Sequence, residues 1–172
     1  MDRKSLTIIR AAGLCALAAI VAWGAFGAGS AAQEKGVRLV RDDAKQRVDV
    51  FVDGQPFTAY IWPATLKKPV LFPLRTAKGT LVTRGFPLDP RPGERVDHPH
   101  HVGLWFNYGD VNGADFWNNT DAVKPEDRPK FGTIVHKAVT AVRSGADKGE
   151  LEVDTDWVLA DGTGPVVLKE HT

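Results

Sequence analysis

Apolar and polar positions alternate most clearly between Arg47 and Trp62. Valines occupy positions 48, 50 and 52, and Asp53-Gly54 then precedes a second run rich in aromatic and β-branched residues. An Asp-Gly pair between two such runs favours a tight hairpin, because glycine accepts the positive φ that the turn requires. The pattern predicts two antiparallel strands joined by a turn at Asp53-Gly54.

A second alternating run covers Glu150 to Leu159, where apolar side chains or threonine occupy every odd position. Such alternation is typical of a strand with one solvated and one buried face. Asp161-Gly162 then turns the chain into another β-rich run over Pro165–Lys169. The same reasoning predicts further strands over Phe131–Val142, Val70–Arg75, Gly79–Thr83 and Val102–Tyr108.

The predicted elements define an all-β fold class for residues 33–172. No window in this range shows the i, i+3, i+4, i+7 spacing of an amphipathic helix. Many short strands joined by Gly and Asp turns favour an antiparallel β-sandwich, with a barrel as the alternative. The sequence stops at Thr172 within a predicted strand. We therefore expect a domain truncated at its C-terminus, the front portion of a longer protein.

The first 32 residues have a different pattern. Arg3, Lys4 and Arg10 precede an uncharged apolar run over 11–28, and small residues follow up to Ala32. This three-part pattern predicts a helical signal peptide over 1–32 and a periplasmic or secreted domain over 33–172. The alternative is an uncleaved anchor, because 18 apolar residues lie at the short end of a bilayer span. Membrane contact is expected only through this segment.

Charge and cysteine content exclude several classes of function. The leader holds 3 of the 22 basic and 1 of the 21 acidic residues, so the domain that follows has a net charge close to −1. A near-neutral domain without a basic stripe is not expected to bind nucleic acid. The single cysteine, Cys15, lies in the leader. Disulfides and thiolate-bound zinc or iron–sulfur clusters are therefore excluded from residues 33–172.

Two long segments interrupt the strand pattern. The first, residues 84–99, contains a proline-rich stretch that cannot form a central strand, because proline lacks a donor N–H. The second, residues 109–129, is rich in Asp and Asn. Long polar loops of this kind are where binding and catalytic residues concentrate.

The densest group of ionisable residues is Asp97-His98-Pro99-His100-His101. In an extended backbone His98 and His100 would face one side and His101 the other. Two imidazoles on one side can hold a divalent metal, or one can act as a general acid–base catalyst while the other positions substrate. The candidate catalytic residues are His98, His100 and His101. The candidate metal ligands are His98 and His100, with a third ligand from Asp110, Asp115 or His136.

The histidine pattern also has a structural interpretation. The His-x-His spacing matches cupin-type metal sites, but the glutamate expected shortly afterwards is absent, and so is the zincin pattern. A neutral histidine donates one hydrogen bond and accepts another, so the three could simply brace the proline-rich loop. Their density beside Asp97 favours a functional site.

Aromatic residues follow the histidines closely at Trp105, Phe106, Tyr108, Phe116 and Trp117. Aromatic rings stack on the C–H faces of sugars, while carboxylates and amides bind the hydroxyl groups. Core packing is expected to account for at least half of the five. The candidate substrate-binding residues are Trp105, Trp117, Asp110 and Asn112, for a small-molecule or glycan ligand.

A set of short blocks along the chain carries a family resemblance. The blocks are Tyr60–Pro63, Lys68–Thr76, Gly79-Thr80, Arg84–Pro87, Asp97–Phe106, Gly109–Gly113 and Asp115–Trp117. Together they resemble an exported bacterial family labelled "methane oxygenase PmoA", a domain of unknown function, over roughly residues 36–172. The resemblance implies a longer protein and a β-supersandwich like that of sugar mutarotases and polysaccharide lyases, which points to carbohydrate use.

The family label does not imply methane chemistry. The methane monooxygenase subunit of that name spans the membrane several times, whereas this sequence has one apolar segment. We therefore expect a protein that binds or modifies a carbohydrate through the His-Pro-His-His loop. A His-ligated metal oxidoreductase and a non-catalytic binding module are the alternatives.

Overall fold

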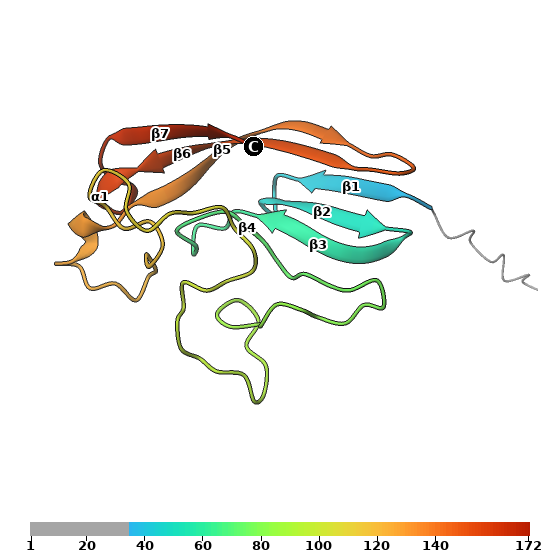
Figure 1. The fold of residues 1–172 in the computed structure, drawn as a ribbon, viewed down its shortest axis with the longest axis horizontal. Coiled ribbons are helices and arrows are strands. Elements are labelled where there is room, and N and C mark those ends of the chain that lie inside the picture. The colour runs from blue at the N-terminus through green and yellow to red at the C-terminus, as the bar shows by residue number, and fades with distance from the viewer. Residues whose placement is uncertain (1–34) are drawn as a thin grey trace, which may run out of the picture. The chain divides into compact units, whose positions relative to one another are not determined.

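Residues 35–172 are described by a computed structural model, and they form two antiparallel sheets with almost no helix (Figure 1). The first sheet has the order β1-β2-β3-β4, formed by Val37–Asp42, Arg47–Val52, Gln55–Ile61 and Val70–Leu71. The second has the order β5-β6-β7, formed by Thr133–Arg143, Glu150–Val158 and Val166–His171. The expected all-β, antiparallel sandwich is confirmed. The predicted signal peptide lies outside the described residues.

The hairpin predicted around Asp53-Gly54 is present. β2 and β3 pair in antiparallel register up to Val52 opposite Gln55. Asp53 and Gly54 both have positive φ, 49° and 73°, as a two-residue hairpin turn requires. The preceding strand, β1, was not predicted, because it has no fully buried residue and its hydrophobic alternation is correspondingly weak.

The second sheet follows the predicted alternation. Val153, Thr155 and Trp157 of β6 are buried, and the residues between them are less so. A single turn, α1 (Leu159–Gly162), leads from β6 towards β7, as the Asp161-Gly162 pair predicts. A short 3-10 helix, η1 (Arg128–Lys130), precedes β5.

Three predicted strands are wrong or too long. Of Val70–Arg75 only Val70–Leu71 is paired as a strand, because Pro73 has no N–H to donate to a ladder. The ranges Gly79–Thr83 and Val102–Tyr108 contribute only single bridges, between Arg75 and Leu81 and between Leu71 and Leu104. The segment between β4 and β5 is therefore a long ordered loop, green to yellow in Figure 1.

The two sheets pack on each other through a small apolar core. Val48 and Tyr60 of the first sheet contact Val139 and Val153 of the second. Separate clusters form around Trp157 and Phe116, and around Val70, Phe72 and Val102 beneath the long loop. Over residues 35–172 no helix is long and apolar enough to span a bilayer.

Candidate functional site

The histidine segment forms a tight turn, so the expectation of an extended backbone is wrong. The His101 N–H donates to the His98 carbonyl oxygen at 2.9 Å. Pro99 occupies the second position of this turn, where its fixed φ is favoured. His98 has a φ of 47°, in the left-handed region. His98 and His100 therefore do not share one face of a strand with His101 opposite.

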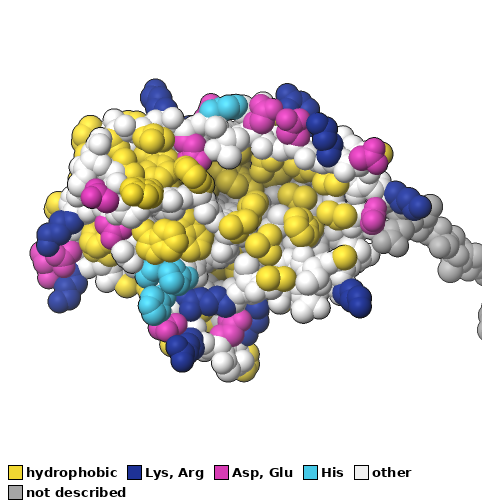
Figure 2. All heavy atoms as spheres, in the orientation of Figure 1, with side chains coloured by type: hydrophobic (Ala, Val, Ile, Leu, Met, Phe, Trp, Pro, Cys, Tyr) yellow, Lys and Arg dark blue, Asp and Glu magenta, His cyan; other side chains and the backbone are white. Residues whose placement is uncertain are grey.

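The turn brings the three imidazoles together. The His98 and His101 rings stack with centroids 5.1 Å apart, and the His100 ring lies 4.2 Å from that of His101. His100 is half-buried, while His98 and His101 are exposed. Figure 2 shows histidine side chains gathered beside the broad apolar area that covers the sheets. The His101 ring therefore lies with those of His98 and His100, and not on the opposite side as an extended backbone would place it.

Hydrogen bonds from Arg84, and not from the imidazoles, fix this loop in position. The Arg84 guanidinium donates to the Asp97 and His101 carbonyl oxygens at 2.6 and 3.2 Å, and also to the His98 carbonyl oxygen. His98 Nδ1 lies 3.2 Å from the carboxylate of its neighbour Asp97. Among the described residues neither the His100 nor the His101 ring makes a hydrogen bond. The structural role considered for these histidines is therefore performed by an arginine.

Gly103 anchors the end of the loop against β4. It has a φ of 62°, and a Cβ there would lie 2.4 Å from the Leu71 carbonyl oxygen. Leu104 then exchanges two backbone hydrogen bonds with Leu71. Only glycine allows this close approach, so the loop has a fixed position relative to the first sheet.

Lys68 lies next to the histidines, and sequence reasoning missed it. The residue is only 3% exposed. Its Nζ donates to the Trp117 carbonyl oxygen at 2.8 Å and lies 4.7 Å from the centroid of the Trp105 ring. Burial lowers the pKa of Lys68 to about 8, and the charge of Asp115 opposes that shift. The sequence gives no signal, because a Lys-Lys pair ordinarily indicates a solvated surface.

Trp105 and Trp117, both predicted as substrate-binding residues, lie beside His101 and Lys68. The Trp105 and Trp117 rings are 5.4 Å apart, and Trp117 meets the His101 ring edge-on at 6.0 Å. Trp117 is 39% exposed, so an apolar ring face remains accessible to a ligand. The indoles and the imidazoles thus form one continuous aromatic surface.

A cavity of about 410 Å³ opens beside the histidine turn. Its polar wall is formed by Thr65, Lys67, Lys68, His100, Asn119, Thr120 and Asp121. Burial, reinforced by the charges of His101 and Lys68, lowers the pKa of His100 to about 4. Burial likewise lowers the pKa of His101. His100 is therefore neutral at pH 7 and can accept a proton or a hydrogen bond.

A buried polar network supports the far wall of this cavity. Asn119, 2% exposed, donates through Nδ2 to the Gly132 carbonyl oxygen at 2.8 Å and to the Asp161 carboxylate at 3.0 Å. Asp161 also pairs with Lys67 at 3.1 Å and with Arg128 at 3.4 Å. Burial favours the neutral form of Asp161, but these partners outweigh it and keep its pKa below the usual value.

The four predicted substrate-contact residues, Trp105, Trp117, Asp110 and Asn112, do not line this cavity. Asp110 accepts a hydrogen bond from the Gly113 N–H at 2.9 Å, and Asn112 lies in the same exposed turn with a φ of 54°. Asp115 accepts hydrogen bonds from the backbone of Trp117 and from Asn118. These geometries stabilise the 109–129 loop and leave the acidic side chains engaged locally.

The proposed third metal ligands do not join the histidine cluster. His136 is hydrogen-bonded to the Tyr60 hydroxyl at 3.1 Å and stacks on Trp62, in a different part of the sandwich. Within residues 35–172 no group of three or more His, Cys, Asp or Glu side chains is arranged to hold a metal ion. The side chains present thus do not match the divalent-metal site considered from the sequence.

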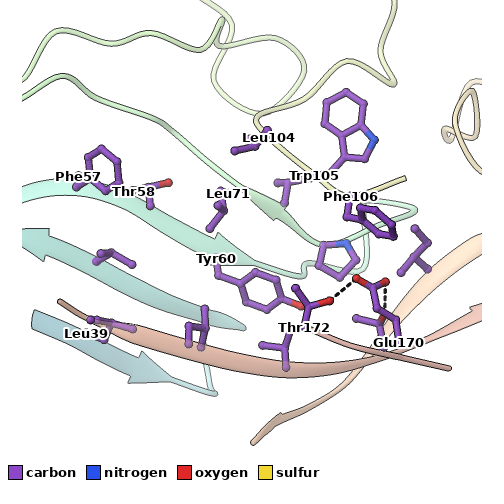
Figure 3. Close-up of a pocket in the computed structure, with 18 of the residues that line it drawn as sticks. Leu39, Phe57, Thr58, Tyr60, Leu71, Leu104, Trp105, Phe106, Glu170 and Thr172 are labelled. Atoms are coloured by element: carbon purple, nitrogen blue, oxygen red, sulfur yellow. Dashed lines mark hydrogen bonds between the residues drawn. The ribbon is translucent and has the colours of Figure 1, made fainter. Parts of the chain in front are cut away.

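A separate apolar groove of about 520 Å³ runs between the sheets (Figure 3). Tyr60, Leu71, Leu104, Trp105 and Phe106 line it. Glu170 is its main charged group, and its carboxylate accepts hydrogen bonds from Trp157 Nε1 at 2.8 Å and from the Thr155 hydroxyl at 3.0 Å. Trp105 contributes both to this groove and to the contact with Lys68.

The fold and site define an all-β sandwich protein with a histidine-flanked cavity. The chain belongs to the family of unknown function DUF6807, whose sequence profile matches residues 47–172. The match covers strands β2 to β7 and both long loops, including the histidine turn. Neither the curated proteins nor the solved structures contain a match. This family match supports neither the methane-oxygenase label nor the expectation of a longer protein.

Proposed function

We propose that this protein binds or modifies a carbohydrate in the cavity beside the histidine turn. The observation that carries the proposal is the placement of His100 and His101. The His100 ring lines the cavity and contacts the His101 ring, which in turn contacts Trp105 and Trp117. Neither imidazole makes a hydrogen bond within the described part of the chain. Polar ring atoms next to a cavity and free of internal partners are available to a ligand. Export through the leader belongs to the same proposal.

The chemistry of the walls fits a hydroxyl-rich ligand. The cavity, about 410 Å³, is within the range of small-molecule sites, roughly 300–1,000 Å³. Neutral His100 lines the cavity and can accept a proton or a hydrogen bond from a sugar hydroxyl. Trp117 lies outside the cavity lining but edge-on to His101, and its exposed face offers a surface for the C–H face of a sugar ring that extends from the cavity.

Replacing His100 by alanine tests this proposal directly. We expect sugar binding to weaken at least about tenfold, because the ring that faces the cavity is lost. The free energy of unfolding should change by no more than about 1–2 kcal/mol, since the ring makes no hydrogen bond that the fold requires. A glycan-binding screen and a denaturant titration of the same preparations supply the two measurements.

His171→Ala is the matched control. This histidine lies at the end of β7 and contacts Asp154 at 2.7 Å, away from the cavity wall. The His171→Ala protein should bind the same glycans as the wild type. Full affinity in His100→Ala would contradict the proposal, and an unfolded His100→Ala protein would show that the histidine is structural. Binding without turnover of any bound glycan would identify a binding module.

A further inference from the structure

The Lys68 ammonium is buried and has no carboxylate partner among residues 35–172. In the part of the chain that the structure describes, no Asp or Glu oxygen lies within 4.0 Å of Lys68 Nζ. Within residues 35–172, Lys68 Nζ donates to the Trp117 carbonyl oxygen and lies over the Trp105 ring face. A buried ammonium normally requires a paired anion, because desolvation of the charge costs several kcal/mol.

The neighbouring residue, Lys67, has the carboxylate partners that Lys68 lacks within the described residues. Lys67 Nζ lies 3.1 Å from Asp161 and 3.1 Å from Asp121. The acidic residue that acts on Lys68 is Asp115, and its oxygens already accept hydrogen bonds from Trp117 and Asn118. The anion that would complete the surroundings of Lys68 is therefore not supplied by residues 35–172.

The cavity wall also contains a buried acceptor without a donor. Asn119 uses its amide nitrogen for the protein network, while its Oδ1 is buried without a hydrogen-bond partner in the described structure. His100 and Lys68 line the same cavity. Its polar requirements are thus one anion and at least one hydroxyl or amide donor.

We infer that the ligand is an acidic sugar whose carboxylate pairs with Lys68, an inference that rests on the carbohydrate-binding function proposed above. The hydroxyl groups of this sugar would meet His100 and Asn119. One ammonium matches the single charge of a carboxylate, whereas a phosphate would bring up to two charges. Lysine acts as a point charge without the bidentate fork of arginine, so it imposes no planar geometry on the anion.

The inference predicts a charge preference that depends on Lys68. Calorimetric titration at about pH 7 compares methyl glucuronide with methyl glucoside, which differ only in the charged group. We expect the glucuronide to bind wild-type protein at least about tenfold more tightly. Lys68→Met should equalise the two affinities, and Lys68→Arg should keep the preference. Lys45→Met, at a lysine whose side chain is 74% exposed, should behave as wild type.

The protonation state of Lys68 gives a second readout on unmodified protein. The pKa of Lys68 is lowered to about 8, so the ammonium is present below that value and lost above it. Affinity for the glucuronide should therefore fall between about pH 7 and pH 9.5, while that for the glucoside should not. If Lys68→Met fails to fold, this series and Lys68→Arg decide the question.

The outcomes separate this inference from the function on which it rests. Equal binding of both sugars, lost in His100→Ala, would retain the proposed function and overturn the acidic ligand. A preference for glucose 6-phosphate over the glucuronide would also overturn the carboxylate assignment, as would a preference that survives in Lys68→Met. Failure of every acidic and neutral sugar to bind would contradict both.

Discussion

Asp161→Ala is expected to destabilise the protein by about 3–5 kcal/mol, because it breaks a buried charge network by removing one partner. The Asp161 side chain is only 8% exposed and pairs with Lys67. It also accepts hydrogen bonds from Asn119 Nδ2 at 3.0 Å and from the Thr133 hydroxyl at 3.3 Å. Without the carboxylate, the buried Asn119 amide and the Lys67 ammonium lose a common partner.

Two variants separate the charge of Asp161 from other effects of its replacement. Asp161→Asn keeps an acceptor oxygen and tolerates the residue's φ of 53°, so its loss should be smaller. Asp121→Ala removes the other carboxylate that pairs with Lys67. The Asp121 side chain is 61% exposed, so this change should lower the free energy of unfolding by less than about 1 kcal/mol. Denaturant unfolding measures all three. An Asp161→Ala loss no larger than that of Asp121→Ala would contradict the account of this network.

Acidification from about pH 6.5 to pH 4 is expected to destabilise the wild type more steeply than His100→Gln. The pKa of His100 is lowered from 6.5 to about 4 by burial and by the charges of His101 and Lys68. Between these values the unfolded chain binds a proton at this residue and the folded protein does not. Stability therefore rises with pH across this window and is lost as pH falls.

The comparison with the variant isolates His100 from the other histidines. Burial also lowers the pKa of His101 and of His136, and both act in the same direction as His100. The Asp154 hydrogen bond raises the pKa of His171, which acts in the opposite direction. All three of these histidines remain in His100→Gln. At about pH 5 unfolding of the wild type should take up close to one proton more than unfolding of the variant. Parallel plots of stability against pH would show that the His100 ring is not buried as the structure places it.

The elements predicted correctly from sequence are those whose alternation matches burial. β6 buries Val153, Thr155 and Trp157, and the β2–β3 hairpin has the Asp-Gly turn that its geometry requires. The wrong strands fail for local reasons: Pro73 lacks a donor, and Gly103 has a left-handed φ next to β4. β1 was missed, because its side chains are only partly buried and leave a weak pattern.

Part of the candidate site could be predicted from sequence. Lys68 could not, because its place in the site depends on tertiary contacts. The histidine segment is visible in the sequence because three imidazoles lie so close together, and Trp105 and Trp117 do lie beside it. The burial of Lys68 depends on a carbonyl oxygen and an indole that are distant along the chain, and a single sequence does not show that they meet.

A crystal structure of the protein soaked with methyl glucuronide tests the central claim most directly. We predict the sugar in the cavity beside the histidine turn, with its carboxylate about 2.7–2.9 Å from Lys68 Nζ and a hydroxyl against His100. Sugar bound in the apolar groove between the sheets, or an empty cavity in crystals soaked at saturating concentration, would contradict the assignment of this cavity as the ligand site.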